Sequence, residues 1–304
     1  MKKRAILLIL GLFLISACTL PFFGQTQPSA GEGLKIEFTT FPSTLYENTP
    51  FQVGVKITNF VKSDVKGYLC ITDYGDPASY GGITEGQCTN AFIPSAYDVS
   101  AGTLESEEIE YSFPLTGGAF EYINLDKDFK TDVTVAAIFN YDVITTAQTN
   151  ICVRNPLLSS SIKEIPCEIK EKISSISQPD MPIEVAQIDK NIMGTADNQA
   201  KLVLAIFLKK VQDGYIIDYK NLEAGMPSKD SAIDVDIRFG KEKMLCKPLD
   251  QGKLKFMNKD ERVLTCELNI PLHQEFLQQP LFINLHYGYQ MLINGNVQVA
   301  KEVN

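Results

Sequence analysis

The chain has 304 residues, 28 of them basic and 37 acidic, and its formal net charge is −9 at pH 7. A surface with this acidic balance repels phosphate groups and anionic lipid headgroups, so nucleic acid is excluded as a partner. About 270 residues follow Gly33, the end of an N-terminal apolar and polar stretch, which is enough for two domains of ordinary size.

The first residues have the pattern of a secretory signal. The basic residues KKR precede the apolar run AILLILGLFLISA, whose 13 residues are too few to cross a membrane core that needs roughly 20. The run ends in ISAC, which resembles a lipobox in which Cys18 becomes the lipid-modified first residue of the mature chain. We therefore predict a lipid anchor on the extracytoplasmic face of the cell membrane. An uncleaved transmembrane anchor that extends to Phe23 is the alternative.

β patterning begins after the polar text QTQPSAGEG. Leu34, Ile36 and Phe38 alternate with polar residues, which is the period-two signal of a strand with one buried face. Three segments of the first half have counterparts in the same order in the second half, and this indicates a duplicated module. The pairs are 50–58 (PFQVGVKIT) with 200–208 (AKLVLAIFL), 111–115 (YSFPL) with 268–272 (LNIPL), and 136–143 (AAIFNYDV) with 283–290 (INLHYGYQ).

Two dipeptides predict hairpin turns, because both supply the positive φ angles that two-residue hairpins need. They are Asp213-Gly214 and Asn294-Gly295. The connector 155–182 has isoleucines at helical spacing within serine-rich text, so it fits a short helix near Pro166 and an extended linker equally well.

The text TPFQVGVKITNF followed by VKGYLCITD resembles the Ig-like CARDB-type modules that occur in tandem in cell-surface proteins. Asn59 and Gly67 stand where such modules have a turn asparagine and a strand-opening glycine, whereas the second copy has Leu208-Lys209-Lys210 in place of the asparagine. The resemblance implies seven-stranded sandwiches used for adhesion, spacing or ligand presentation, with no catalytic residues.

The fold that we predict is all-β, with two tandem Ig-like antiparallel sandwiches. Its segments are a signal peptide (1–17), a flexible tether (18–33), sandwich 1 (34–154), a connector (155–182) and sandwich 2 (183–304).

Six cysteines follow Cys18, and they fall as three neighbouring pairs. Six cysteines allow 15 connectivities, so the sequence leaves the pairing open. We predict neighbour pairing, because disulfides persist in an oxidising compartment and none of the pairs has the CxxC spacing of a metal or redox motif. The predicted bridges are Cys70–Cys88, Cys152–Cys167 and Cys246–Cys266.

Catalytic constellations are sparse in this sequence. The sequence has two histidines, His273 and His286, but no GxSxG motif with a serine that they could activate as bases. Each cysteine after Cys18 has a predicted disulfide partner and so is not a free nucleophile. We therefore predict no enzyme activity and no cofactor other than calcium. The first candidate for calcium is NLDKDFKTD, in which Asp126, Asp128 and Asp132 have the spacing of hard-cation ligands. Two further candidates are the acidic residues of DYGD (73–76) and of AIDVDIRF (232–239).

The segment from Cys70 to Cys88 and the residues after it combine tyrosine and phenylalanine with glycine, serine and aspartate. Binding loops have this composition, since tyrosine offers rigid contact area and small residues offer adaptable hydrogen bonds. The predicted interaction residues are Tyr74, Tyr80, Phe92 and Tyr97. A long strand connection is the alternative. The counterpart in the second copy, from Cys246 to Cys266, is basic and has no tyrosine.

These features predict a membrane-anchored lipoprotein that acts in surface interaction, adhesion or envelope architecture, with a protein or envelope partner. One alternative is a capture lipoprotein that delivers a ligand to a membrane complex from a pocket around Tyr287 and Tyr289. A secreted hydrolase without a recognisable motif is the other.

Overall fold

The computed structural model describes residues 33–75, 80–83, 87–100, 103–125, 130–156, 167–195, 199–223, 232–256, 259–271 and 276–301. They form an all-β fold, which confirms the predicted class. Its strands pair antiparallel, apart from β2 (Thr44–Tyr46), which pairs in parallel with the end of β19 (Phe276–Ala300). A short 3-10 helix, η1 (Tyr219–Asn221), is also present. No helix in these ranges is long and apolar enough to span a membrane.

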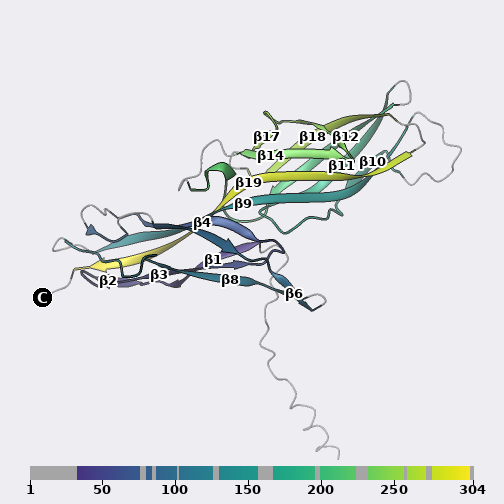
Figure 1. Cartoon of the computed structure of the whole chain (residues 1–304). Coiled ribbons are helices and arrows are strands. Elements are labelled where there is room, and N and C mark those ends of the chain that lie inside the picture. The colour runs from purple at the N-terminus through teal and green to yellow at the C-terminus, as the bar shows by residue number, and fades with distance from the viewer. Residues whose placement is uncertain are drawn as a thin grey trace, which may run out of the picture. The chain divides into compact units, whose positions relative to one another are not determined.

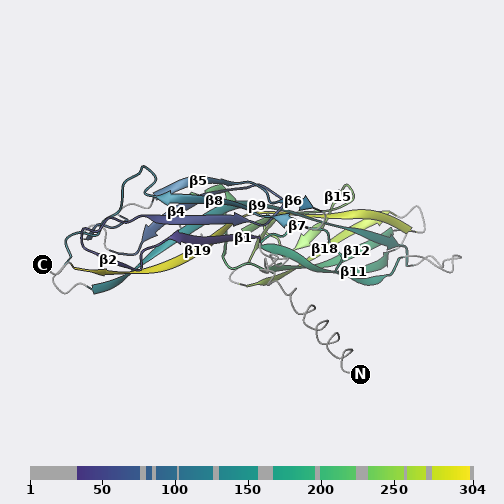
Figure 2. The ribbon, with the colours of Figure 1, turned by 90° about the horizontal axis from the view of Figure 1, so that it is seen from below.

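Two strands of 25 residues each organise the whole fold. β9 (Lys130–Arg154) and β19 pair antiparallel along their full lengths, from Phe276 opposite Arg154 to Ala300 opposite Lys130. Asp142 and Gly288 face each other at the centre. At about 3.3 Å per residue, each strand spans at most about 80 Å. Figures 1 and 2 show β19, the yellow strand, extending through two separate groups of strands. We call these groups lobe 1 and lobe 2.

Lobe 1 is a sandwich of two sheets. One sheet has the order β1-β3-β8, and the other places β4 and β5 beside residues 130–141 of β9 and 289–300 of β19. A separate hairpin of β6 and β7 lies between β5 and β8 in the chain. The strands are β1 (Leu34–Thr40), β3 (Val53–Asn59), β4 (Val65–Asp73), β5 (Gln87–Ile93), β6 (Tyr97–Ser100), β7 (Thr103–Glu105) and β8 (Glu107–Phe113).

Lobe 2 has the same plan. A five-stranded sheet of order β10-β11-β12-β18-β16 packs against the other halves of the long strands, residues 143–154 and 276–287, which β14 extends together with β15 and β17. β13 (Tyr215–Ile217) pairs with β19 near the centre of the ladder. The other strands are β10 (Lys170–Ile173), β11 (Ile183–Thr195), β12 (Gln199–Lys210), β14 (Ala232–Phe239), β15 (Glu242–Lys243), β16 (Leu245–Lys247), β17 (Lys253–Lys255) and β18 (Glu261–Pro271).

The two copies of the predicted repeat therefore exchange strand halves. β3, β8 and β9 occupy in the first copy the places of β12, β18 and β19 in the second, as the matched segments indicated. Each long strand begins in the lobe of its own copy and ends in the other lobe. Val297 and Val299, from the end of the second copy, are fully buried opposite β9 and β2 of lobe 1. Ile151 and Val153, from the first copy, are buried in the same way in lobe 2.

This exchange runs across the predicted boundaries at 34–154 and 183–304. Residues 31–304 form one compact unit, since the edge strand of each lobe comes from the other copy. The Asn294-Gly295 hairpin prediction is wrong, because both residues lie inside β19 opposite Ala136 and Val135. The strand after Asp213-Gly214 pairs with β19 rather than folding back on β12.

The connector is described from Cys167, and its isoleucine pattern does not form a helix there. Residues 170–173 form β10, an edge strand that pairs with β11. Ile173 packs into the core of lobe 2. Of the two interpretations that the sequence left open, the extended one holds in this part of the connector.

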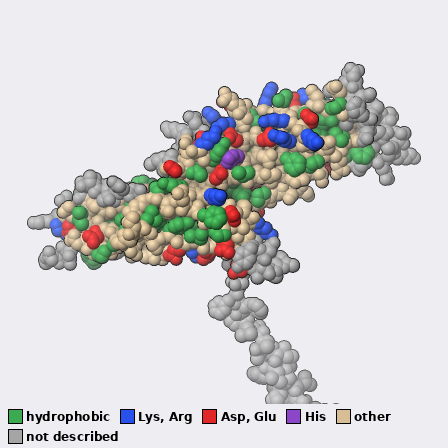
Figure 3. All heavy atoms as spheres, in the orientation of Figure 1, with side chains coloured by type: hydrophobic (Ala, Val, Ile, Leu, Met, Phe, Trp, Pro, Cys, Tyr) green, Lys and Arg blue, Asp and Glu red, His purple; other side chains and the backbone are tan. Residues whose placement is uncertain are grey.

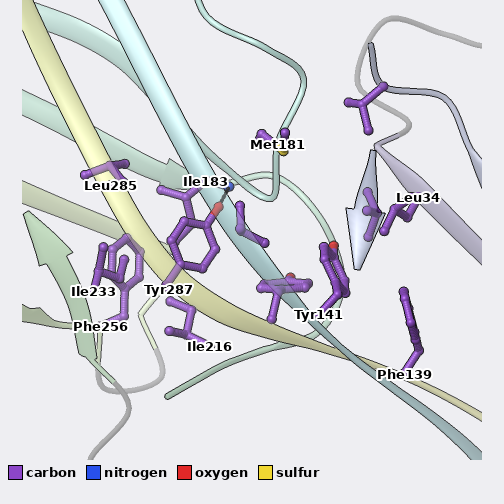
Figure 4. Close-up of a cluster of buried hydrophobic side chains, with 14 of the residues drawn as sticks. Leu34, Phe139, Tyr141, Met181, Ile183, Ile216, Ile233, Phe256, Leu285 and Tyr287 are labelled. Carbon is purple, nitrogen blue, oxygen red and sulfur yellow. Dashed lines mark hydrogen bonds between the residues drawn. The ribbon is translucent and has the colours of Figure 1, made fainter. Parts of the chain in front are cut away.

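A cluster of tyrosines fills the junction between the lobes (Figure 4). Tyr141, Tyr287 and Tyr289 are almost fully buried around the centre of the ladder. The Tyr287 hydroxyl accepts a hydrogen bond from the Ile183 backbone N–H (3.1 Å), and the Tyr289 hydroxyl donates to the Gln212 carbonyl (2.6 Å). Burial in this apolar environment raises the pKa of all three phenols.

The folded chain begins at this junction. Figure 4 draws Leu34 in the same buried cluster as Tyr141 and Phe139, and the Gly33 carbonyl accepts a hydrogen bond from the Phe60 N–H (3.1 Å). A Cβ on Gly33 would collide with the Gln212 side chain of lobe 2. Whatever precedes β1 is therefore attached at the centre of the ladder.

Two residues of the CARDB-like text have structural roles. Asn59 is fully buried; its amide donates to the Ser63 and Pro94 carbonyls, and its oxygen accepts from the Val61 N–H. These bonds close the turn between β3 and β4. A side chain at Gly67 would collide with the Asn140 carbonyl oxygen and the Phe139 ring, so only glycine lets β4 approach β9 here.

Candidate interaction surface

Three disulfides join the cysteines in the predicted neighbouring pairs. Cys70–Cys88 links β4 to β5, and Cys246–Cys266 links β16 to β18, each between residues directly opposite one another. The first bridge lies in the nine-stranded sheet that contains the ladder, and the second lies in the five-stranded sheet of lobe 2. The two bridges are therefore not equivalent in the repeat, and the predicted correspondence between their loops is wrong.

Asp73 organises the described part of the Cys70–Cys88 segment. Its side chain is buried at the end of β4, and its Oδ2 accepts hydrogen bonds from the Tyr122 hydroxyl (3.0 Å) and the Ile83 N–H (2.9 Å). Burial, together with the adjacent carboxylate, raises the pKa of Tyr122 well above its usual value. A Cβ on Gly82, which has a φ of +79°, would collide with the side chains of Tyr122 and Asp73. The segment is thus tied to the lobe by a carboxylate as well as by its disulfide.

The four predicted interaction residues do not form one patch. Tyr74 (58% exposed) follows β4 at one end, and Phe92 (47% exposed) pairs opposite Lys66 at the other end. Eight residues of strand separate these positions, which is about 26 Å. Tyr80 is partly buried and packs against the core. Tyr97 lies in β6, and its side chain is outside the described residues.

An apolar strip lies between Tyr74 and Phe92 on the outer face of lobe 1. Cys70, Ala136 and Ile138 form a small buried cluster, and Tyr68 and Cys88 pack against it, so the exposed apolar area of the strip belongs mainly to its two ends, Tyr74 and Phe92. In the strand register, Cys88, Cys70, Ile138 and Leu292 lie in one row across four strands. Hydrophobic side chains gather on the face of lobe 1 shown in Figure 3. The sequence did not predict this strip, because it combines β4 and β5 with residues of β9 and with Leu292 of β19, which lies more than two hundred residues after Cys88 in the chain.

The predicted calcium ligands lie partly outside the described residues and are partly paired with basic side chains. Asp126 and Asp128 lie outside the described residues, and Asp132 is exposed at the start of β9. Asp234 and Asp236 share one face of β14, as expected, but basic side chains engage both: Lys253 contacts Asp234 (3.7 Å), while Arg238 (2.7 Å) and Lys243 (3.3 Å) contact Asp236. Burial opposes ionisation of Asp236, yet its two cations hold the pKa below the usual value. Within the described ranges, no three His, Cys, Asp or Glu side chains converge as a metal site would require.

His286 is a residue of the outer sheet face, as its strand position indicated. Its Nε2 lies 2.8 Å from Asp142 Oδ1, and the Tyr219 ring stacks on the imidazole with 3.6 Å between ring centroids. The Tyr219 hydroxyl donates to Asp234 (3.0 Å). The imidazole is therefore bonded to a carboxylate and covered by a phenol, and this arrangement attaches η1 to the ladder. His273 lies outside the described residues.

A shallow hollow of about 440 Å³ lies on the five-stranded sheet of lobe 2. Two rows of cross-strand neighbours line it, Lys170–Asn191–Val203 and Lys172–Asp189–Ala205. Lys190, which lies between Asp189 and Asn191 on β11, is buried and contacts Glu171 and the Cys152 carbonyl oxygen. The hollow is open, and both charge signs line it.

No protein-family model matches the chain, and no curated protein is similar to it in sequence. The molecule's own geometry therefore carries the functional argument. Tyr287 and Tyr289, around which a capture pocket was predicted, are fully buried with their hydroxyls bonded to the protein. They offer no surface to a ligand.

Proposed function

We propose that this protein is a membrane-tethered extracytoplasmic interaction protein that presents two rigidly joined β lobes to protein or envelope partners and has no catalytic role. The observation that carries the proposal is the uninterrupted β9–β19 ladder. A flexible linker between domains gives independent motion, whereas 25 consecutive strand pairs make the lobes one body. Such a body serves spacing and presentation.

The position where the folded chain begins supports the same proposal. Since Gly33 packs against Gln212, whose carbonyl accepts the Tyr289 hydroxyl near the centre of the ladder, a lipid on Cys18 would be attached near that centre, with each end of the ladder up to about 40 Å from it along the strands. The disulfides agree with an oxidising, extracytoplasmic compartment. The lobe 1 strip that runs from Tyr74 past the Cys70–Cys88 bridge to Phe92 is the contact surface that we propose.

Two measurements test this proposal. Membrane fractionation should find the wild-type chain in the membrane and the Cys18→Ala variant released from it. Capture from solubilised envelope should retain a partner on the wild type and lose it with the Tyr74→Ala/Phe92→Ala variant. Ile144→Ala is the matched control, because that side chain is equally exposed (61%) but lies outside the strip. Identical partners on wild type and double variant would remove the strip, and membrane retention of Cys18→Ala would favour a transmembrane anchor.

A further inference from the structure

Charge is distributed unequally between the two copies. Residues 18–154 contain 7 basic and 17 acidic residues, whereas residues 155–304 contain 18 and 20. Within each half the excess is concentrated further. The segment 105–110 has four glutamates and no basic residue, and the segment 238–259 has seven basic residues and two acidic ones. The two segments belong to different lobes, which the β9–β19 ladder connects.

Among the described residues, the acidic segment lies along the last strand of a sheet. β8 is the last strand of the β1-β3-β8 sheet, and Glu108 and Glu110 are exposed on the outer face of that sheet. Lys56 contacts both Glu108 and Glu37, and Lys35 also contacts Glu37, so Glu37 has two ammonium partners and Glu108 has a share of one. Glu110 contacts the Thr39 hydroxyl. This side of lobe 1, which we call the acidic edge, therefore keeps uncompensated negative charge.

The basic segment follows two open edges in lobe 2. β16 ends the five-stranded sheet and β15 ends the nine-stranded sheet, so both sheets of the lobe stop on this side. Lys241 and Lys247 are exposed here, and Leu245 between them is 81% exposed, more than any other large apolar side chain in the described ranges. Figure 3 shows blue side chains gathered on lobe 2, the lobe that carries His286. We call this side the basic edge.

We propose that the partner of the basic edge is the acidic edge of a second copy of this chain. Open edges present unpaired backbone N–H and C=O groups, and opposite charge steers two such surfaces together and fixes their register. Leu245 supplies the apolar contact that charges alone lack. Each molecule has one edge of each kind, so the contact is heterologous and repeats from molecule to molecule as a head-to-tail row. This inference rests on the proposed function and names a partner for it.

Charge reversal provides the test, with the full chain in detergent measured by analytical ultracentrifugation. The wild type should self-associate, and the association constant should fall at least tenfold between low salt and 0.5 M salt, because exposed charges are screened. Glu108→Lys/Glu110→Lys should be monomeric, because the segment 105–110 then has two glutamates and two lysines and no longer attracts the basic edge. Lys241→Glu/Lys247→Glu should be monomeric, because the segment 238–259 falls from seven basic and two acidic residues to five and four and loses most of its positive charge. An equimolar mixture of the two variants should recover association, since each supplies the edge that the other lacks.

Recovery in the mixture supports the proposal, because a folding defect in either variant would not be cured by the other. A wild type that stays monomeric at low salt overturns it, as does a mixture that stays monomeric. Binding of the wild type to anionic vesicles is measured as a second experiment. If the wild type is monomeric and binds vesicles through Lys241 and Lys247, the basic edge recognises an anionic surface instead. That result would leave the proposed interaction function intact while refuting the self-association.

Discussion

The strand exchange predicts that residues at the end of the second copy stabilise the lobe built by the first. Val297 and Val299 are fully buried in lobe 1, opposite Val133 and Thr131 of β9, and Val299 also pairs with Leu45 of β2. Truncating each valine to alanine removes two buried carbons, worth about 0.8 kcal/mol each. The double variant Val297→Ala/Val299→Ala should therefore lose about 3 kcal/mol from transfer alone, and more if the cavities do not close.

Hydrogen exchange measured by mass spectrometry assigns that loss to a lobe. In the double variant, amides of β3 and β4 in lobe 1 should exchange faster by a factor that matches the loss measured in denaturant. The matched control is Ile151→Ala/Val153→Ala, which makes the same kind of cavity at the mirrored position in lobe 2 and should act first on β11 and β12. If the valine variant left lobe 1 protection unchanged and exposed only lobe 2, the exchange of strand halves would be refuted.

Three further outcomes follow from the structure. Asp73→Ala removes the acceptor of two buried hydrogen bonds and should cost about 2–4 kcal/mol in chemical denaturation, whereas Asp132→Ala at an exposed position should change stability by less than about 0.5 kcal/mol. The Tyr141 hydroxyl is buried and has no hydrogen-bond partner among the described residues, so Tyr141→Phe should leave stability unchanged or raise it by up to about 1 kcal/mol. Tyr289→Phe loses the hydrogen bond to the Gln212 carbonyl and should cost about 1 kcal/mol. The reverse order of the two stabilities would contradict the assignment. The fragment 183–304 lacks residues 143–154 and should remain unfolded or self-associate through the bare edge of β19, so a stable monomer in ultracentrifugation would restore the prediction of two independent domains.

Local features were predictable from the sequence because they depend on neighbours in the chain. The period-two alternation of Leu34, Ile36 and Phe38 gave β1, and the three matched segments indicated the strands that occupy equivalent places in the two lobes. Cysteine spacing gave the three bridges. The alternation and each cysteine pair lie within about twenty residues, and the duplication is visible by comparing short segments directly.

The failures share a physical cause. Asn294-Gly295 is a strong turn signal, yet Gly295 lies in a strand because the ladder to β9 continues through it and the Phe41 ring occupies the space that a Cβ would need. The aromatic residues after Cys70 have the composition of one binding loop, but strand register separates Tyr74 from Phe92 and packs Tyr80 against the core. Composition predicts what a side chain is able to do, and register decides which side chains meet.

The sequence by itself indicated an all-β, disulfide-bonded chain, since alternation and cysteine spacing are local properties, and its matched segments predicted a repeat. Only the tertiary structure decided that the two copies share their long strands. A strand edge accepts any partner whose apolar face and register match, and β9 and β19 meet that condition equally well. Which half of each strand completes which lobe is therefore settled by the burial of residues such as Val299 and Ile151, whose partners lie in the other copy.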